Sequence, residues 1–304
     1  MRIGIIMGGI SSEREVSLRS GEAIYNNINK KKYDVVKIII DSKEDIIDKV
    51  KKEKIDFALL ALHGQFGEDG MVQSVLQCME VKYSGCGHLS SAVCMDKDIA
   101  KNVLKSKNIR TARWINLRNV DEIDYEEIEK LRYPVFVKPT HGGSSVATFM
   151  VKQKEDILKA VKEGFKVDSE VMIEEFIQGE EITCPILNGK ICPILAIEPT
   201  SDFFDFESKY KDGGAKEYIV NLEEELKKEV TRMALETYRA LKCSVYARVD
   251  FIVTKDMVPY VLEVNTLPGM TENSLFPKSV MGINMSYEKL VDRIIEESLK
   301  DKRK

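Results

Sequence analysis

Short apolar runs alternate with amphipathic stretches through the first third of the chain. Three runs are typical of buried strands, Arg2 to Met7, Val35 to Ile40 and Asp56 to Leu62. Between them, Ser12 to about Ile28 and Lys43 to Glu53 are predicted helices. Strands that alternate with helices predict an α/β fold built around a parallel sheet.

The middle of the chain begins with Leu89 to Ser106, which is predicted to form one helix. Two strands, Tyr133 to Lys138 and Val146 to Val151, are predicted on either side of a glycine- and serine-rich loop, and Glu170 to Ile177 is predicted to be another. Pro199 to Ala215 mixes aromatic residues with charge and has no clean period. A long irregular segment of this kind predicts a functional lid or disorder.

Strand and helix patterns continue toward the C-terminus. Ile182 to Leu187 and Ile191 to Ile197 are predicted strands, Leu222 to Leu241 a long amphipathic helix and Ser286 to Leu299 a closing helix.

Two β-branched runs, Val245 to Val253 and Val258 to Val264, flank a short polar stretch and predict a β-hairpin. Side chains two residues apart on a strand share a face. The polar side chains brought together in this way are Arg248 and Asp250 on the first strand and Glu263 and Asn265 on the second.

Two carboxylates and an amide oxygen on one face suit a hard divalent cation, since Mg²⁺ takes one or two protein carboxylates together with phosphate oxygens and water. The alternative is a surface hairpin with its charges in solvent. Glu263 favours the cation site, because an ionised carboxylate is rarely placed in an apolar run without a partner.

Composition excludes several classes of protein. The 304 residues are 43% hydrophobic and carry a formal net charge of -4, so no general affinity for nucleic acid or anionic membranes is expected. The six cysteines form no CxxC pair, and we expect reduced thiols in a cytoplasmic protein. The apolar start, Met1 to Met7, is too short for a signal peptide or a membrane span.

Two loops near the N-terminus are candidate ligand sites. Ser12-x-x-Glu15, after a Gly-Gly turn, matches a capping box, so spacing alone favours a helix-capping role for Glu15. His63 opens the loop HGQFGEDG at the carboxyl end of a predicted strand, where open α/β sheets usually bind ligands. Binding and structural roles for His63 are equally consistent with this position.

Lys138 ends a strand and is followed by a loop, PTHGGSS, whose amides and hydroxyls can surround phosphate oxygens. The loop is not a Walker A motif, and a flexible hairpin tip is the alternative. Further on, Gln178 to Glu181 is a predicted linker between domains, where main-chain groups can bind an adenine edge and a carboxylate can bind ribose hydroxyls.

Taken together, the stretches SSEREVS, HGxxGEDG, Lys138-Pro with Gly-Ser-Ser, Lys209-Tyr210 and RxD…ExNTxPGMTENS resemble those of D-alanine–D-alanine ligases of the ATP-grasp superfamily. The resemblance covers essentially the whole chain. It implies an ATP-grasp fold of three α/β domains, with the nucleotide between the central and C-terminal domains. The implied divisions are an N-terminal substrate domain at 1–90, a central lid domain at 91–178 and a C-terminal catalytic domain at 179–304.

The resemblance also implies a two-step ligation in peptidoglycan precursor synthesis. The carboxylate of one D-alanine attacks the γ-phosphate of ATP, giving an acyl phosphate and ADP. The amine of a second D-alanine then attacks the activated carbonyl, and phosphate leaves. Two Mg²⁺ ions are implied as cofactors, with Mn²⁺ as a substitute, and a homodimer is implied as the assembly.

Roles for individual residues follow from the same resemblance. Those implied to bind the nucleotide and metal are Asp250, Glu263 and Asn265 for the metal, Lys97, Lys138 and Lys209 for phosphates, and Glu174 and Glu181 for adenine and ribose. Those implied to act on the amino acids are Arg248 with the Gly269 amide for the oxyanion, Glu15 and His63 for the first D-alanine, and Ser274 with the Leu275 amide for the second. Glu15, Ser144 and Tyr210 are implied to hold the lid closed, which replaces the capping role of Glu15.

Tyr210 favours an amine over D-lactate as nucleophile, because relatives that make D-alanyl-D-lactate generally carry another residue there. The chain departs from its relatives at Gln73 to Gln77, at Ala147 and at Glu217-Tyr218 after the lid. The alternatives are a ligase for D-lactate or D-serine and a non-catalytic ATP-binding module. A non-catalytic module is expected to lose Arg248, Glu263 or Asn265, and all are present.

Overall fold

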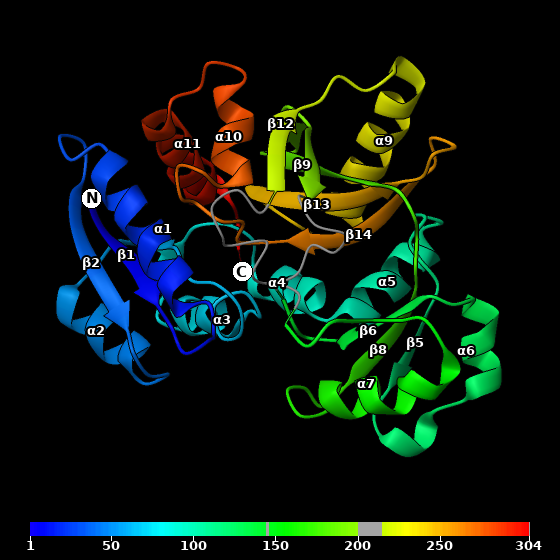
Figure 1. The fold of residues 1–304 in the computed structure, drawn as a ribbon. Coiled ribbons are helices and arrows are strands. Elements are labelled where there is room, and N and C mark those ends of the chain that lie inside the picture. The colour runs from blue at the N-terminus through cyan, green and yellow to red at the C-terminus, as the bar shows by residue number, and fades with distance from the viewer. Residues whose placement is uncertain (144–145, 200–214, 304) are drawn as a thin grey trace.

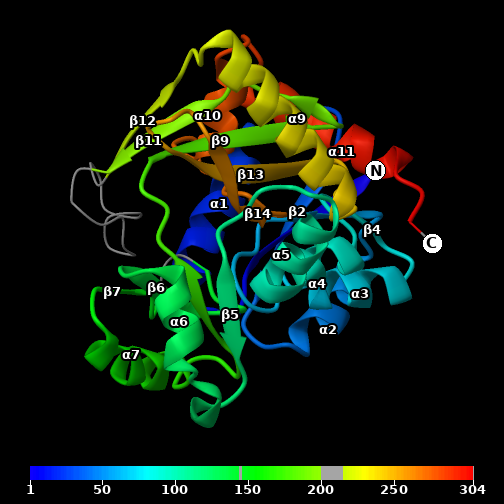
Figure 2. The ribbon, with the colours of Figure 1, turned by 90° about the vertical axis from the view of Figure 1, so that its right-hand side faces the viewer.

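The computed structural model describes residues 1–143, 146–199 and 215–303. Its strands form three sheets, seen from two sides in Figure 1 and Figure 2. The predicted Ser144, Lys209 and Tyr210 lie outside the described residues.

The N-terminal sheet has the order β2-β1-β3-β4, and all its strand pairs are parallel, as the alternating pattern predicted. Its strands are β1 (Arg2–Gly8), β2 (Asp34–Ile40), β3 (Phe57–Leu60) and β4 (Lys82–Tyr83), with helices α1 (Arg14–Asn27), α2 (Asp45–Glu53) and α3 (Met71–Cys78). β1 and β3 are buried along almost their whole length, which fits their continuous apolar runs, whereas the edge strand β2 keeps Lys37 and Ile39 exposed.

The central sheet has the order β5-β8-β6-β7 and is antiparallel. Its strands are β5 (Trp114–Leu117), β6 (Val135–Pro139), β7 (Phe149–Val151) and β8 (Val171–Glu175). Helical turns accompany it, namely η1 (Val120–Glu122), α6 (Tyr125–Leu131), η2 (Lys154–Asp156) and α7 (Ile157–Gly164).

The C-terminal sheet has the order β12-β11-β9-β13-β14, with β10 paired to β9. Its strands are β9 (Glu180–Leu187), β10 (Lys190–Ile191), β11 (Leu195–Pro199), β12 (Ala215–Ile219), β13 (Tyr246–Val253) and β14 (Pro259–Asn265). The helices that follow β12 are α9 (Glu224–Ala240), α10 (Leu275–Met281) and α11 (Tyr287–Lys300). The predicted hairpin is confirmed, because β13 and β14 pair antiparallel with Asp250 opposite Glu263.

Two of the predicted elements are wrong. The single helix expected over Leu89 to Ser106 is two helices, α4 (His88–Met95) and α5 (Lys97–Ser106), separated at Asp96. Asp96 has an extended backbone, and its side chain accepts a hydrogen bond from the Ile99 amide, so it caps α5. The strand expected over Ile191 to Ile197 is divided between β10 and β11.

The hydrophobic cores cross the predicted domain divisions at residues 90 and 178, which stay predictions. Phe276 of α10 and Leu290 of α11 belong to the same buried cluster as Ile5 of β1. Leu104 of α5 is buried with Val249 of β13. Helices from one predicted domain therefore complete the core of another.

All six cysteines are free thiols. Among the described residues, none of the helices combines the length and the apolar character that crossing a membrane requires.

Gly179 sits where the chain passes from the central to the C-terminal sheet, and it provides a test of this junction. A Cβ added there would lie 2.2 Å from the carbonyl oxygen of Val253, which is backbone and cannot turn aside. We expect Gly179→Ala to destabilise the protein by about 1–3 kcal/mol, measured by denaturant unfolding. Gly87→Ala is the control, because a Cβ at Gly87 meets nothing within 4 Å. Equal stabilities of the two variants would contradict this account.

Candidate functional site

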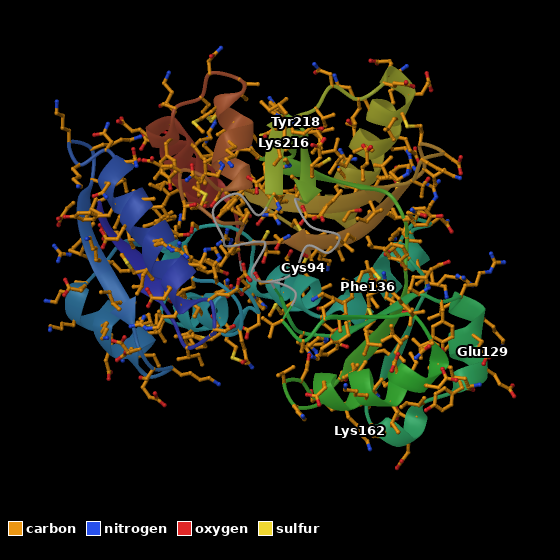
Figure 3. The ribbon with its side chains drawn as sticks, in the orientation of Figure 1. Cys94, Glu129, Phe136, Lys162, Lys216 and Tyr218 are labelled. Carbon is orange, nitrogen blue, oxygen red and sulfur yellow. The ribbon has the colours of Figure 1, made fainter. Side chains whose placement is uncertain are left out.

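One cavity of about 1220 Å³ is lined by residues of the central and C-terminal sheets, and by residues of α1 and of the loop after β3. In Figure 3, Phe136 of β6, Cys94 of α4 and Tyr218 of β12 mark its walls, and all three line it. Its size suits a small-molecule site of the larger kind. The predicted site residues that line it are His63, Lys97, Lys138, Glu174, Glu181, Arg248, Asp250, Glu263, Asn265, Gly269, Ser274 and Leu275.

The hairpin supplies an ordered set of charged groups on one wall. Asp250 is 2% exposed, and Arg248 donates to both of its oxygens, from Nε at 2.9 Å and from Nη2 at 2.8 Å. Thr183 donates to Asp250 Oδ1 at 2.5 Å, and the amide nitrogen of Asn265 donates to Oδ2 at 2.9 Å. Since its nitrogen is engaged in this way, Asn265 keeps its amide oxygen for another contact.

Burial alone would lower the pKa of Arg248, but the Asp250 carboxylate outweighs it and the net pKa is raised. The guanidinium therefore stays charged in the cavity. Glu263 lies directly opposite Asp250 on β14, so the carboxylates share a face as the strand pattern predicted.

Across the cavity, lysines from α5 and β6 face the hairpin. Lys97, the first residue of α5, donates from Nζ to the carbonyl of Gly142 in the loop after β6. Lys138 Nζ lies 2.5 Å from Glu174 Oε2. The other oxygen of Glu174 accepts from Lys101 Nζ at 2.6 Å. Glu174 thus lines the cavity with both oxygens held by lysines, an arrangement different from the implied contact with adenine or ribose.

Glu13, which the sequence analysis missed, occupies the place expected of Glu15. Glu15 is exposed and does not line the cavity, whereas Glu13 is 9% exposed and does. Gly64 permits this approach, because a Cβ there would lie 2.8 Å from Glu13 Oε2. The capping box at Ser12 is also absent, since α1 begins at Arg14 without a side-chain cap. Glu13 is therefore the acidic residue of the SSEREVS motif that reaches the cavity.

His63 lies beside Glu13 on the same wall and is 7% exposed. Its Nε2 is 3.1 Å from Ser20 Oγ, and its Nδ1 is 3.6 Å from Glu68 Oε1. Burial raises the pKa of Glu68, although His63 opposes the shift. The HGQFGEDG loop therefore brings a partly buried carboxyl and an imidazole to the cavity, as its position at the end of β3 predicted.

Gly269, Ser274 and Leu275 form the wall next to the hairpin. Ser274 is the residue before α10, and its Oγ accepts from the Thr271 amide at 3.0 Å. A Cβ at Gly269 would lie 2.9 Å from that oxygen. The chain passes close to Ser274 here because residue 269 has no side chain.

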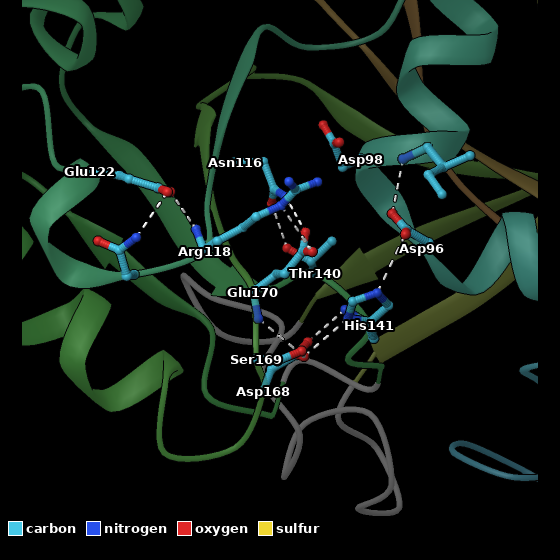
Figure 4. Close-up of polar contacts among 12 residues, drawn as sticks. Asp96, Asp98, Asn116, Arg118, Glu122, Thr140, His141, Asp168, Ser169 and Glu170 are labelled. Carbon is cyan, nitrogen blue, oxygen red and sulfur yellow. Dashed lines mark hydrogen bonds and ion pairs between the residues drawn. The ribbon is translucent and has the colours of Figure 1, made fainter.

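The loop that carries Gly142 is anchored by an ionic cluster (Figure 4). His141 Nδ1 lies 3.0 Å from Asp168 Oδ1, and its Nε2 lies 3.4 Å from Asp96 Oδ2. The His141 amide also donates to Asp168 Oδ2 at 2.7 Å. Thr140, just before it, donates from Oγ1 to Asn116 Oδ1 at 2.6 Å. Because Asp96 caps α5, the cluster joins the start of that helix to the loop.

Hydrogen bonds from the imidazolium to Asp168 and Asp96 raise the pKa of His141 to about 10. Burial would raise the pKa of each aspartate, but His141 outweighs it and both are lowered. His141 is therefore a fixed cation at neutral pH.

The raised pKa of His141 predicts a pH-dependent contribution to stability. The contribution is complete below the unfolded-state pKa of about 6.5 and is lost as the pH rises toward 10, because the unfolded chain releases its proton first. We expect the difference in unfolding free energy between wild type and His141→Gln to shrink from pH 6 to pH 10. His88→Gln, at an exposed histidine outside the cluster, is the control. A difference that stays constant over this range would refute the assignment.

Comparisons with known proteins agree on one family. The model described as D-ala D-ala ligase C-terminus matches residues 97–296, and the model described as D-ala D-ala ligase N-terminus matches residues 2–49 and 43–86. A D-alanine--D-alanine ligase of Clostridium botulinum (strain Alaska E43 / Type E3) is 66% identical over 99% of both chains.

Solved structures extend the likeness to the fold. A D-alanine--D-alanine ligase of Bacillus anthracis, complexed with ATP, is 47% identical with a TM-score of 0.90, over 99% of this chain and 98% of that one. The VanG D-Ala:D-Ser ligase of Enterococcus faecalis is 32% identical with a TM-score of 0.85, over 98% of this chain and 99% of that one. The chain described here therefore belongs to the D-alanine–D-alanine ligase family and has the ATP-grasp fold of that family.

Proposed function

We propose that the protein joins two D-alanine molecules in the cavity, with ATP as the source of energy. The observation that supports the proposal is that two sets of polar and charged residues line one cavity. The hairpin presents Asp250, Glu263 and Asn265, and the opposite wall presents Lys97 and Lys138. A triphosphate needs both sets, cations for its oxygens and carboxylates for the metal ions that accompany it.

The hairpin residues fit Mg²⁺. They place two carboxylates and an amide oxygen on one face, the hard oxygen donors that this ion takes alongside phosphate oxygens and water. Both oxygens of Asp250 accept hydrogen bonds from Arg248, Thr183 and Asn265, so a bound ion would replace one of these donors. We assign Asp250, Glu263 and Asn265 to it. When bound, the ion neutralises charge on the transferring phosphoryl group.

The ATP site proposed here extends from the hinge to the lysines. Glu181 and the main chain around Gln178 line the cavity at the hinge and are assigned to ribose and adenine. Lys97 and Lys138 are assigned to the phosphates, with Lys209 as a further prediction. Glu174 is assigned to holding Lys138, because both of its oxygens are taken by lysines.

The amino acids are placed on the far side of the hairpin. Glu13 is assigned to the ammonium group of the first D-alanine and His63 to its carboxylate. Ser274 and the Leu275 amide are assigned to the carboxylate of the second. The first carboxylate attacks the γ-phosphorus and ADP leaves, after which the second amine attacks the acyl carbonyl, loses a proton and expels phosphate.

Arg248 and the Gly269 amide are assigned to the oxyanion of the tetrahedral intermediate formed in the second step. Arg248 is suited to this role because Asp250 and the strand pairing fix its guanidinium in place before the charge develops. Donors that are oriented in advance contribute about 3–4 kcal/mol to such steps. The hydrogen-bonded link predicted between Glu15, Ser144 and Tyr210 stays a prediction. The homodimer also stays a prediction.

Phosphate release and mass spectrometry of the products test the proposed reaction. With ATP and Mg²⁺, we expect D-alanine to give phosphate, ADP and D-alanyl-D-alanine, and L-alanine to give neither peptide nor phosphate. D-Serine and D-lactate are added beside D-alanine as competing second substrates, since the similar VanG structure is a D-Ala:D-Ser ligase. A dominant D-alanyl-D-serine or depsipeptide product would overturn the second-substrate assignment, and ATP binding without turnover would overturn the reaction.

Glu13 and Glu15 form a matched pair for the first amino-acid site. Glu13→Gln removes a carboxylate in the cavity, so we expect the KM for D-alanine at this site to rise on the order of tenfold or more. Glu15→Gln removes an exposed carboxylate two residues away and should leave the kinetics unchanged. The reverse result would restore the role implied for Glu15. If neither variant changed the kinetics, neither Glu13 nor Glu15 would bind the first D-alanine.

A further inference from the structure

Lys101 is a buried cation that the proposed reaction does not use. It lies on α5, one helical turn after Lys97, and is 3% exposed. Its Nζ donates to Glu174 Oε1 at 2.6 Å and to Thr111 Oγ1 at 2.7 Å. A buried ammonium group is rarely retained unless it is paired, and the pairing here is with a residue that lines the cavity.

The pairing creates a group of three charges, Lys101, Glu174 and Lys138, in which two ammonium groups share one carboxylate. Lys138 Nζ lies 2.5 Å from the second oxygen of Glu174 and is the member of the group that also reaches the cavity as a cation. Burial would raise the pKa of Glu174, but the lysines outweigh it and hold that pKa at about 2. The carboxylate is thus ionised, and the group carries one net positive charge.

Glu174 alone would cancel the charge of Lys138. The carboxylate is buried, so water screens it little, and its attraction for Lys138 competes directly with that of a phosphate. Lys101 supplies the second cation that Glu174 needs. Burial lowers the pKa of Lys101, and the Glu174 carboxylate opposes that shift.

The position of Lys101 is fixed from a second side by Thr111. Thr111 Oγ1 accepts from Lys101 and donates to the carbonyl of Val261 at 2.8 Å. Val261 lies on β14, two residues before Glu263, and its amide donates to the Arg110 carbonyl at 2.9 Å. Through Glu174 and Thr111, the Lys101 ammonium group therefore connects β8 of the central sheet to β14, the strand that carries Glu263 and Asn265.

We propose that Lys101 is a positioning residue for ATP, which it never touches. By taking one oxygen of Glu174 it holds that carboxylate in place and leaves Lys138 with charge available to the phosphates. The proposal rests on the proposed placement of the triphosphate beside Lys138. Lys101 therefore contributes to the affinity for phosphate although it lies outside the phosphate site.

Calorimetric titration of the full chain with ATP and with adenosine, both with Mg²⁺ present, separates charge from structure. Lys101→Met keeps the length of the side chain and removes its charge. We expect its Kd for ATP to rise roughly tenfold and its Kd for adenosine to stay within about twofold, because adenosine lacks phosphates. Lys105→Met, at an exposed lysine one turn further along α5, is the control and should change neither.

The double variant Lys101→Met/Glu174→Gln keeps the test valid if the single variant unfolds with an unpaired carboxylate. It removes one charge of each sign and leaves Lys138 as the single cation. We expect its ratio of adenosine Kd to ATP Kd to return close to that of wild type.

Equal weakening of ATP and adenosine in Lys101→Met would overturn the proposal in favour of a purely structural ion pair. An unaltered ATP affinity, or a double variant no better than the single one, would overturn it as well. Wild-type protein that binds ATP no more tightly than adenosine would instead refute the phosphate site beside Lys138, and that result does not depend on any variant.

Discussion

Pairing of charges away from water is the constraint on which this cavity depends. Arg248 with Asp250, and Lys101 and Lys138 with Glu174, are groups whose ionised forms would be costly to bury alone. Arg248 and Asp250 are neighbours on β13, whereas Lys101, Lys138 and Glu174 come from α5, β6 and β8. The fold therefore has to bring α5, β6 and β8 together before the charges of the second group are tolerated.

The pairing also explains why the cavity is prepared for a highly charged ligand. Its charged side chains are oriented by one another and not by the ligand, so little reorganisation remains when the ligand enters. His141 extends the same logic to the loop after β6, where two aspartates hold one cation. We therefore expect stability and ligand binding to depend on the same set of ion pairs.

Much of this arrangement could be predicted from local sequence pattern. The hairpin was predicted correctly because two β-branched runs separated by a short polar turn indicate strands that pair with each other. The two-residue periodicity of these strands then placed Asp250 and Glu263 on one face. Parallel pairing in the N-terminal sheet followed from alternation of strands and helices. Both features depend on neighbours in the chain.

Features that depend on residues far apart in the chain could not be predicted from the sequence. Glu13 and Glu15 lie in the same motif, and only the position of the HGQFGEDG loop shows which of them reaches the cavity. The break at Asp96 arises because its side chain caps α5 and meets His141, a residue far along the chain. Lys101 carries no local signal at all, since its partners are on β8 and in the segment before β5.

The shared core between the two ends of the chain has a consequence for biosynthesis. Phe276 and Leu290 are buried with the first strand, and Arg303 donates to the carbonyl of Tyr83 at 2.8 Å. A ribosome makes the N-terminal sheet long before it makes α10 and α11. Until α10 and α11 have left the exit tunnel, the apolar surface that they cover has no permanent partner. The core of the first sheet can therefore be completed only after both helices have been made, although its strands are translated first.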